Sequence, residues 1–330
     1  MATNLPLIIV IDELITLGYR LPQSLSTVNT VSALELADFT KYYGEDLGID
    51  GVSFTVNNGE AFGFLGPNGA GKTTTMRLLL GLIKPTRGSA LVLGKDISGG
   101  PSVREKVGYL PGTLALYENL TGQEFLDFFA KMRGRDCRRQ IQSLSERFDL
   151  DLTRHIHDLS KGNLQKLGVV QAFMHEPDLL LLDEPTSGLD PLVQREFAEL
   201  VRETTARGGT LLLSSHVMSE VELLTDRVAI VNVGKLLLVE RITDLKARAV
   251  RSVELDFPDA VDPNIFEKLA SVSRVTAHRN RIICKVSGSE TELLRLAVEN
   301  DVQMVITHEP DLNEIFLSLI SSELSTEGAA

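Results

Sequence analysis

Short apolar runs alternate with helical patterns through most of the chain after residue 32. Runs that are typical of strands lie at residues 33–39, 52–56, 61–65 and 90–93. Continuous apolar runs follow at residues 179–182, 210–213 and 228–231, and helical stretches separate them. Because apolar strands that alternate with helices are typical of a sheet buried on both faces, the pattern predicts an α/β fold built on a mainly parallel sheet.

Two regions depart from this alternation. Between about residues 112 and 166 the apolar spacing becomes helical, which predicts an insert within a main domain of residues 33–240. Its apolar positions are Phe125, Leu126, Phe128, Phe129, Ile141, Leu144 and Phe148. After residue 240, strand-like runs interleave with helices near Ile265 and Leu294 in the order β-α-β-β-α-β. This order predicts a small α+β domain of the ferredoxin-like type over residues 241–330.

Residues 1–32 show neither pattern. The apolar run at residues 5–11 has no Lys or Arg before it, and acidic residues follow at once, so it does not match a signal peptide. Residues 22–32 are rich in Ser, Thr and Asn, as linkers are. We interpret residues 1–32 as an appendage, either disordered or the product of a start codon placed too early, with Val31 as the true beginning.

A glycine-rich segment, residues 66–74, joins the strand at 61–65 to a predicted helix at 73–80 and reads G-P-N-G-A-G-K-T-T. Its glycines allow the backbone N–H groups to wrap around an anion, and the helix N-terminus adds a positive dipole end. Lys72 supplies a charge for the β- and γ-phosphates, and the Thr73 hydroxyl can bind Mg²⁺. We call this segment the phosphate loop. It predicts a nucleotide site formed by Gly66, Pro67, Asn68, Gly69, Ala70, Gly71, Lys72, Thr73 and Thr74.

Two carboxylates, Asp183 and Glu184, follow the apolar run at residues 179–182. Ligands of open α/β sheets bind beyond the carboxyl ends of the strands, so both acids should face the phosphate loop. Asp183 is then suited to hold Mg²⁺, directly or through water, and Glu184 to polarise the attacking water. His216 follows the next strand and is predicted to contact the γ-phosphate, whereas His155 and His157 are interpreted as surface residues.

Composition and charge narrow the classes of partner. The formal net charge is −12, which argues against a nucleic-acid partner because phosphate backbones require a basic face. No apolar run approaches the roughly 18 residues of a membrane helix, so any work at a membrane would need another chain to cross it. Cys137 and Cys284 stand alone, which favours buried thiols in a reducing cytosol.

Two further segments complete a pattern that resembles the ATP-binding subunit of a bacterial ABC transporter. Residues 159–163, which read L-S-K-G-N and are called the signature segment below, precede the acidic strand, and residues 187–190 (S-G-L-D) follow it. The resemblance covers roughly residues 33–240. It implies an ABC-type P-loop fold, with a mainly parallel sheet, an antiparallel β part and a helical insert. It also implies hydrolysis of Mg-ATP, with Glu184, His216 and Lys72 as the catalytic residues.

The resemblance assigns roles beyond the phosphate loop. The signature segment would complete the ATP site of a second subunit, either a second copy or a homologous ATPase. There Ser160, Gly162 and Asn163 would approach the γ-phosphate, since Ser160 can cap a helix starting near Gly162. Asp190 would lie in the loop that crosses this interface. Tyr43 matches the aromatic residue that stacks on adenine, with Tyr42 as its rival.

Two departures from the family pattern bear on function. The usual signature has Gly and Gln where this chain has Lys161 and Asn163; Asn keeps the amide, and Lys adds a charge that favours phosphate. Relatives usually carry Gln at the position of Gly112, and that Gln contacts the metal region and the membrane partner. The family pattern therefore does not indicate which residues of this chain couple ATP hydrolysis to the membrane partner.

The end of the chain, residues 309–316, resembles bacterial export-type ATPases, including those that serve drug and antibiotic efflux. This likeness implies an exporter whose substrate is chosen by a separate integral membrane permease, with the ATPase bound at the cytoplasmic face of the membrane. The alternative is a soluble ABC ATPase that acts on ribosomes or DNA, but the single phosphate loop, the absence of sustained heptads and the net charge of −12 argue against it. A generic P-loop kinase would lack the signature segment.

Overall fold

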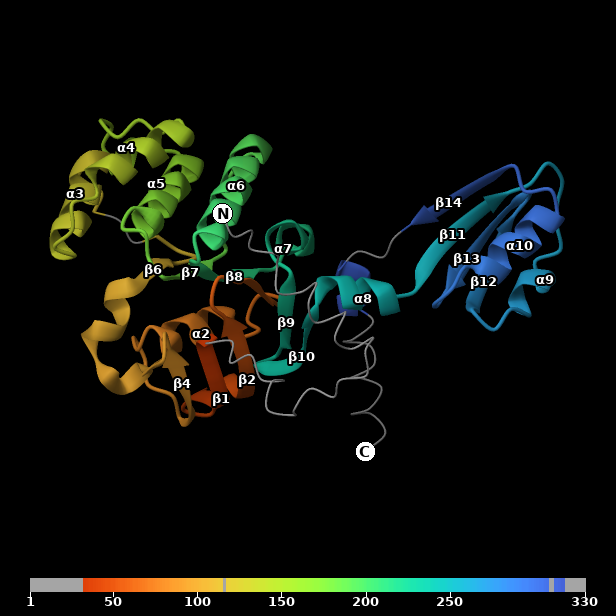
Figure 1. Ribbon diagram of the computed structural model, residues 1–330, viewed down its shortest axis with the longest axis horizontal. Helices are drawn as coiled ribbons and strands as arrows, with labels where there is room; N and C mark the ends of the chain where they lie inside the picture. Colours follow the sequence, from red (N-terminus) through yellow and green to blue (C-terminus); the bar gives the residue numbers. More distant parts are fainter. Residues whose placement is uncertain (1–31, 115–116, 309–311, 318–330) are drawn as a thin grey trace, which may run out of the picture. The chain divides into compact units, whose positions relative to one another are not determined.

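The computed structural model describes residues 32–114, 117–308 and 312–317. Within these residues the main element is a sheet of ten strands in the order β5-β4-β1-β2-β10-β9-β3-β8-β7-β6 (Figure 1). Its parallel part contains β3, β6, β7, β8 and β9, which span Ala61–Leu65, Val107–Leu110, Leu179–Asp183, Thr210–Ser215 and Arg227–Asn232. The predicted α/β fold with a mainly parallel sheet is confirmed.

The antiparallel part of the sheet is formed near the start of the described chain. It contains β1, β2, β4 and β5, which span Ser32–Tyr43, Asp46–Asn57, Arg87–Val92 and Lys95–Asp96. β10 (Lys235–Arg241) pairs antiparallel with β9 and links the two parts through one parallel pair, Lys235 with Asp50. The predicted strands do not include β10, because a short, half-buried apolar run does not distinguish strand from helix.

Strand β7 shows why the parallel strands carry continuous apolar runs. Its successive side chains point to opposite faces of the sheet. Leu179 and Leu181 belong to a core with Met76 and Leu78 of α2 (Lys72–Leu79). Leu180 and Leu182 belong to a second core with residues of α5 (Lys161–Phe173), α6 (Pro191–Ala206) and α7 (Met218–Leu224). The strand is therefore buried on both faces.

The predicted helical insert contains α3 (Gly122–Met132) and α4 (Arg138–Arg147) and continues into α5. Helix α3 begins at a capping box, in which the Thr121 hydroxyl accepts from the Glu124 N–H and the Glu124 carboxylate accepts from the Thr121 N–H. Helix α5 ends at Phe173 rather than near residue 166. Most of its length is buried, so its end carries no amphipathic signal.

The remaining helices of the described residues are short. Helix α8 spans Ile242–Arg248, and 3₁₀ helices span Ile97–Gly99, Pro101–Lys106 and Ile156–Asp158. Leu312, Ile315 and Phe316 are buried in the same core as Leu182 and Leu245. The backbone N–H of Leu312 donates to the Glu222 carboxylate at 3.0 Å.

A second sheet, of four strands, follows residue 250 and has its own core. Its strands β11, β12, β13 and β14 span Arg251–Asp256, Val272–His278, Arg281–Val286 and Met304–His308. Helices α9 (Asn264–Glu267) and α10 (Thr291–Glu299) separate them, and the order in the sheet is β12-β13-β11-β14. β13 thus lies between β11 and β12, which is the split βαβ arrangement of the predicted ferredoxin-like type.

The predicted appendage, apart from Ser32 at the start of β1, lies outside the described residues. Among the described helices, none combines the length and the apolar character that crossing a membrane requires. Both cysteines are free and buried, as predicted.

One buried histidine should make stability depend on pH. His175 is 3% exposed; its Nε2 lies 3.3 Å from the Val107 carbonyl oxygen, and its Nδ1 has no hydrogen-bond partner among the described residues. Burial, followed by the charge of Arg133, lowers the pKa of His175 to about 4. His175 therefore binds a proton near pH 6.5 in the unfolded chain but only near pH 4 in the folded chain.

Above pH 6.5 His175 is neutral in both states and does not lower the free energy of unfolding. As the pH falls from 6.5 towards the folded pKa of about 4, protonation of the unfolded chain lowers the free energy of unfolding. We expect the wild-type free energy of unfolding to fall by about 2 kcal/mol more between pH 7 and pH 5 than that of His175→Gln. Denaturant titrations of both proteins at the two pH values measure this difference. Equal pH slopes for the two proteins would show that His175 is protonated at little cost in the folded state.

Candidate nucleotide site

The phosphate loop connects β3 to α2 and depends on glycine for its shape. Gly71, which precedes α2, has φ +98°, a conformation that L side chains rarely adopt. A Cβ atom there would lie 2.5 Å from the Gly48 carbonyl oxygen and 2.5 Å from Ile49 Cγ2. Gly66 is equally confined, because its Cβ would lie 2.4 Å from the Val231 carbonyl oxygen. The loop is therefore held tightly against β2 and β9.

Lys72 lies at the start of α2 and is 6% exposed. Its Nζ donates to the carbonyl oxygens of Gly66 at 2.8 Å and Pro67 at 3.2 Å. The same ammonium lies 3.5 Å from Glu184 Oε1. The lysine charge is thus fixed between the phosphate loop and the end of β7, where it can attract an anion held by the loop.

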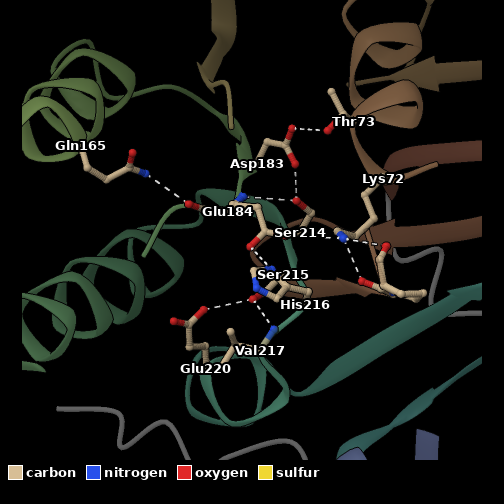
Figure 2. Close-up of polar contacts among 12 residues, drawn as sticks. Lys72, Thr73, Gln165, Asp183, Glu184, Ser214, Ser215, His216, Val217 and Glu220 are labelled. Carbon is tan, nitrogen blue, oxygen red and sulfur yellow. Dashed lines mark hydrogen bonds and ion pairs between the residues drawn. The ribbon is translucent and has the colours of Figure 1, made fainter. Parts of the chain in front are cut away.

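Asp183 ends β7, is 1% exposed and accepts two hydroxyl hydrogen bonds. Thr73 Oγ1 donates to its Oδ2 at 2.6 Å, and Ser214 Oγ of β8 donates to its Oδ1 (Figure 2). Thr73 and Asp183, each predicted from the sequence as a metal ligand, are therefore in contact although 110 positions separate them in the sequence. These are hard oxygen donors of the kind that Mg²⁺ prefers.

Glu184 follows Asp183 and has φ +52°, which is uncommon for a residue with a side chain. Its backbone N–H donates to the Ser214 carbonyl oxygen at 3.1 Å. Its Oε2 lies 2.7 Å from Nδ1 of His216, which follows β8. Figure 2 shows Lys72 and His216 on either side of the Glu184 carboxylate. The predicted trio of Lys72, Glu184 and His216 is brought together at the carboxyl ends of three neighbouring strands.

The phosphate loop opens into a cavity of about 420 Å³. Its lining includes Tyr43, Lys72, Thr73, Asp183 and Glu184, but not Tyr42. Both tyrosines are exposed, at 44% and 39%, and Lys41 Nζ lies 5.2 Å from the centre of the Tyr43 ring. The position of Tyr43 favours it over Tyr42 for stacking on a base.

The signature segment and Asp190 do not line this cavity. Ser160 is the N-cap of α5, and its hydroxyl accepts from the Asn163 N–H at 3.3 Å, as the predicted capping role requires. Asp190 caps α6 by accepting from the N–H groups of Leu192 and Val193. These groups therefore lie outside the nucleotide cavity of their own chain.

The structure adds residues to the cavity that the sequence patterns did not indicate, notably Arg77 and Tyr109. Burial, followed by the negative charge of Asp183, raises the pKa of Tyr109. Arg77 and Tyr109 fit the helix and the strand in which they lie, so no local sequence pattern marks them as residues of the cavity. His155 and His157 are exposed, as predicted, and their rings lie 5.4 Å apart.

Gly112 also lines the cavity, beside the predicted metal site. A Cβ atom at this position would lie 3.1 Å from Asp183 Oδ2 and 3.3 Å from its Cγ. A side chain here would therefore press against the carboxylate that Thr73 contacts.

A strand, a glycine-rich loop and a helix beside an acidic strand end together define a P-loop nucleoside triphosphatase.

Comparison with known proteins narrows this class. The ABC transporter family matches residues 49–187. The chain is 35% identical over 296 residues to the bacitracin transport ATP-binding protein BcrA of Bacillus licheniformis, covering 87% of this chain and 97% of BcrA. It is 41% identical to the probable multidrug ABC transporter ATP-binding protein YbhF of Escherichia coli, over 68% of this chain but only 40% of YbhF.

A solved structure of an ATP-binding subunit of an ABC transporter is similar in fold and sequence. It superimposes with a TM-score of 0.62 at 34% identity, and the match covers 65% of this chain and 92% of that one. The chain therefore belongs to the ATP-binding subunits of ABC transporters.

Proposed function

We propose that Lys72, Thr73, Asp183, Glu184 and His216 form the hydrolytic site of this chain. The observation that carries the proposal is their convergence on one cavity beside the phosphate loop. Lys72 and the loop N–H groups hold the β- and γ-phosphates, and His216 contacts the γ-phosphate. Glu184 accepts a proton from the attacking water, a role that its contacts with Lys72 and His216 support by fixing the carboxylate in place.

The metal in this proposal is Mg²⁺. Thr73 and Asp183 offer a hydroxyl and a carboxylate oxygen at one point, and the described residues contain no cluster of three or more His, Cys, Asp or Glu that could form a complete metal cage. Such a small donor set suits Mg²⁺, which is usually bound by one or two carboxylates together with substrate phosphates. The metal would neutralise charge on the phosphates while Glu184 orients the water.

We propose that two cassettes form two shared sites. In each site, the phosphate loop of one subunit would face Ser160, Gly162 and Asn163 of the other subunit. The second subunit is another copy of this chain or a homologous ATPase. The exposure of Ser160 and its place at the start of α5 support this role, because the free N–H groups of a helix start suit a phosphate. Asp190 would lie in the loop that crosses between the subunits.

We propose that hydrolysis drives export through a separate membrane permease, with this chain bound at its cytoplasmic face. The names of BcrA and YbhF, for bacitracin and multidrug transport, support a drug or antibiotic cargo. The permease would select the substrate. Phosphate release from the purified chain, with and without Mg²⁺, tests the ATPase, and identification of the membrane protein that co-purifies with it tests the transport role. Co-purification with ribosomes alone would favour the soluble alternative.

The missing glutamine at Gly112 gives a prediction about coupling. We expect Gly112→Gln to keep basal ATP hydrolysis within about ten-fold, since only local movement beside Asp183 is needed to admit the side chain. Exposed Glu118 lies a few residues on, and Glu118→Ala should weaken stimulation by the permease. Both rates are measured in reconstituted membranes with and without the permease. Normal coupling in Glu118→Ala but not in Thr113→Ala would place the contact nearer the phosphates.

A further inference from the structure

Gln165 is a buried polar residue that the proposed chemistry does not use. It lies on α5, just beyond the signature segment, and is 7% exposed. Its Nε2 donates to the carbonyl oxygen of Glu184 at 3.2 Å (Figure 2) and to that of Pro185 at 2.9 Å. Both partners can only accept hydrogen bonds, so the amide group of Gln165 must present its nitrogen to them.

These bonds act on the peptide groups that set the direction of the Glu184 side chain. Glu184 has φ +52°, and its N–H is held by Ser214 on one side. Its carbonyl oxygen is held by Gln165 and by the N–H of Ser187 at 3.2 Å. The left-handed turn at Glu184 is thus fixed at both ends, and the side chain leaves it towards Lys72 and His216.

The same helix also supports the signature segment. Ser160 caps α5, and one turn further on Gln165 reaches the residues after β7. Gly162 lies against the same loop, because a Cβ atom there would be 3.0 Å from the Gly188 carbonyl oxygen. The signature segment and the backbone of Glu184 are therefore parts of one packed assembly within the chain.

From these contacts we propose that Gln165 is a positioning residue for hydrolysis, which ties the backbone of Glu184 to the helix that carries the signature segment. The proposal rests on the proposed role of Glu184. Gln165 does not touch the nucleotide cavity. It acts by keeping the Glu184 carboxylate aimed at the attacking water, so that a shift of α5 is conveyed to the site.

Gln165→Met tests this with a side chain of similar size that cannot donate. We expect kcat for ATP hydrolysis to fall by about ten- to a hundred-fold, because small misplacements of a catalytic group have effects of this size. The Kd for ATP, measured by nucleotide titration with Mg²⁺, should change by less than about three-fold. The reason is that the orientation of the Glu184 carboxylate matters only in the transition state and not for binding. A merely structural role would instead lower the melting temperature and leave the kcat of the folded fraction intact.

Gln165→Glu provides a second readout and carries the test if the methionine variant does not fold. Its carboxylate would oppose two carbonyl oxygens, whereas the protonated acid can donate to one of them. We expect its kcat, as a fraction of the wild-type value, to rise at least about three-fold from pH 8 to pH 6 as the acid form gains population. The corresponding fraction for Gln165→Met should stay constant over this range.

Gln194→Met is the matched control. Gln194 Nε2 donates to the Leu189 carbonyl oxygen at 3.2 Å, so it makes the same kind of bond at the other end of the same loop. We expect its kcat to stay within about two-fold of wild type. The inference is overturned if Gln165→Met keeps kcat within that range, if its loss lies only in ATP affinity, or if Gln194→Met loses as much. A wild-type chain without Mg²⁺-dependent phosphate release would instead overturn the proposed function.

Discussion

Lys72→Ala should abolish ATP binding or turnover. Lys72 is buried between the Gly66 and Pro67 carbonyl oxygens and Glu184, and among the described residues no second lysine lines the cavity. A hydrogen bond to a charged group contributes about 1.5–3 kcal/mol, and the β- and γ-phosphates together would lose more than one such interaction. We therefore expect at least about a hundred-fold weaker ATP binding or slower turnover, measured by nucleotide titration and phosphate release.

The matched control is Lys106→Ala. Lys106 also forms an ion pair, with Asp178 at 2.7 Å, but both side chains are exposed and lie outside the cavity lining. Its removal should leave ATP affinity within about two-fold, since exposed pairs contribute little. Unchanged affinity and rate in Lys72→Ala would mean that the phosphate loop is not the nucleotide site.

Glu184→Gln should separate binding from chemistry. The substitution removes the proton acceptor but keeps the length of the side chain, and general-base catalysis contributes about 10²–10⁴-fold to rates. We expect turnover to fall by this factor while ATP still binds, because the phosphate loop and the Thr73–Asp183 pair are untouched. In the proposed two-subunit arrangement, the ATP-bound dimer should then accumulate and appear as a larger species on size exclusion with Mg-ATP.

Glu196→Gln serves as the control, because Glu196 is exposed and pairs with Arg147 at 3.2 Å away from the cavity. It should hydrolyse ATP at the wild-type rate. A Glu184→Gln protein that turns over normally would remove Glu184 from the chemistry. Only monomer in the presence of Mg-ATP would leave the proposed shared sites without their main support.

The sequence could predict the parts of this molecule whose chemistry has a fixed spacing. The phosphate loop needs glycine where φ is positive or a Cβ atom would collide, as at Gly71, and a lysine and a threonine directly after it. The strand at Leu179–Asp183 carries apolar side chains for two cores and then an abrupt pair of acids. Such demands leave a local signal, so the loop, the acidic strand end and the α/β alternation were predictable.

Other features depend on contacts between distant segments and leave no local signal. Arg77 and Tyr109 line the cavity only because α2 and β6 meet there, and each fits its own element without any special requirement. The two bonds of Gln165 join positions on a helix and a loop that no spacing rule connects. The end of α5 at Phe173 was hidden because a helix buried on most sides has no amphipathic period.

The contact between His216 and Glu184 also fixes the arrangement of protons on the imidazole ring. Nδ1 lies 2.7 Å from a carboxylate oxygen, which can only accept, so Nδ1 carries a hydrogen. The Glu184 contact therefore commits Nδ1 to the carboxylate and leaves Nε2 as the ring nitrogen through which His216 would meet a phosphate oxygen. Because the two nitrogens lie on opposite sides of a rigid ring, the position of Glu184 sets the direction from which His216 can approach the γ-phosphate in the proposed site.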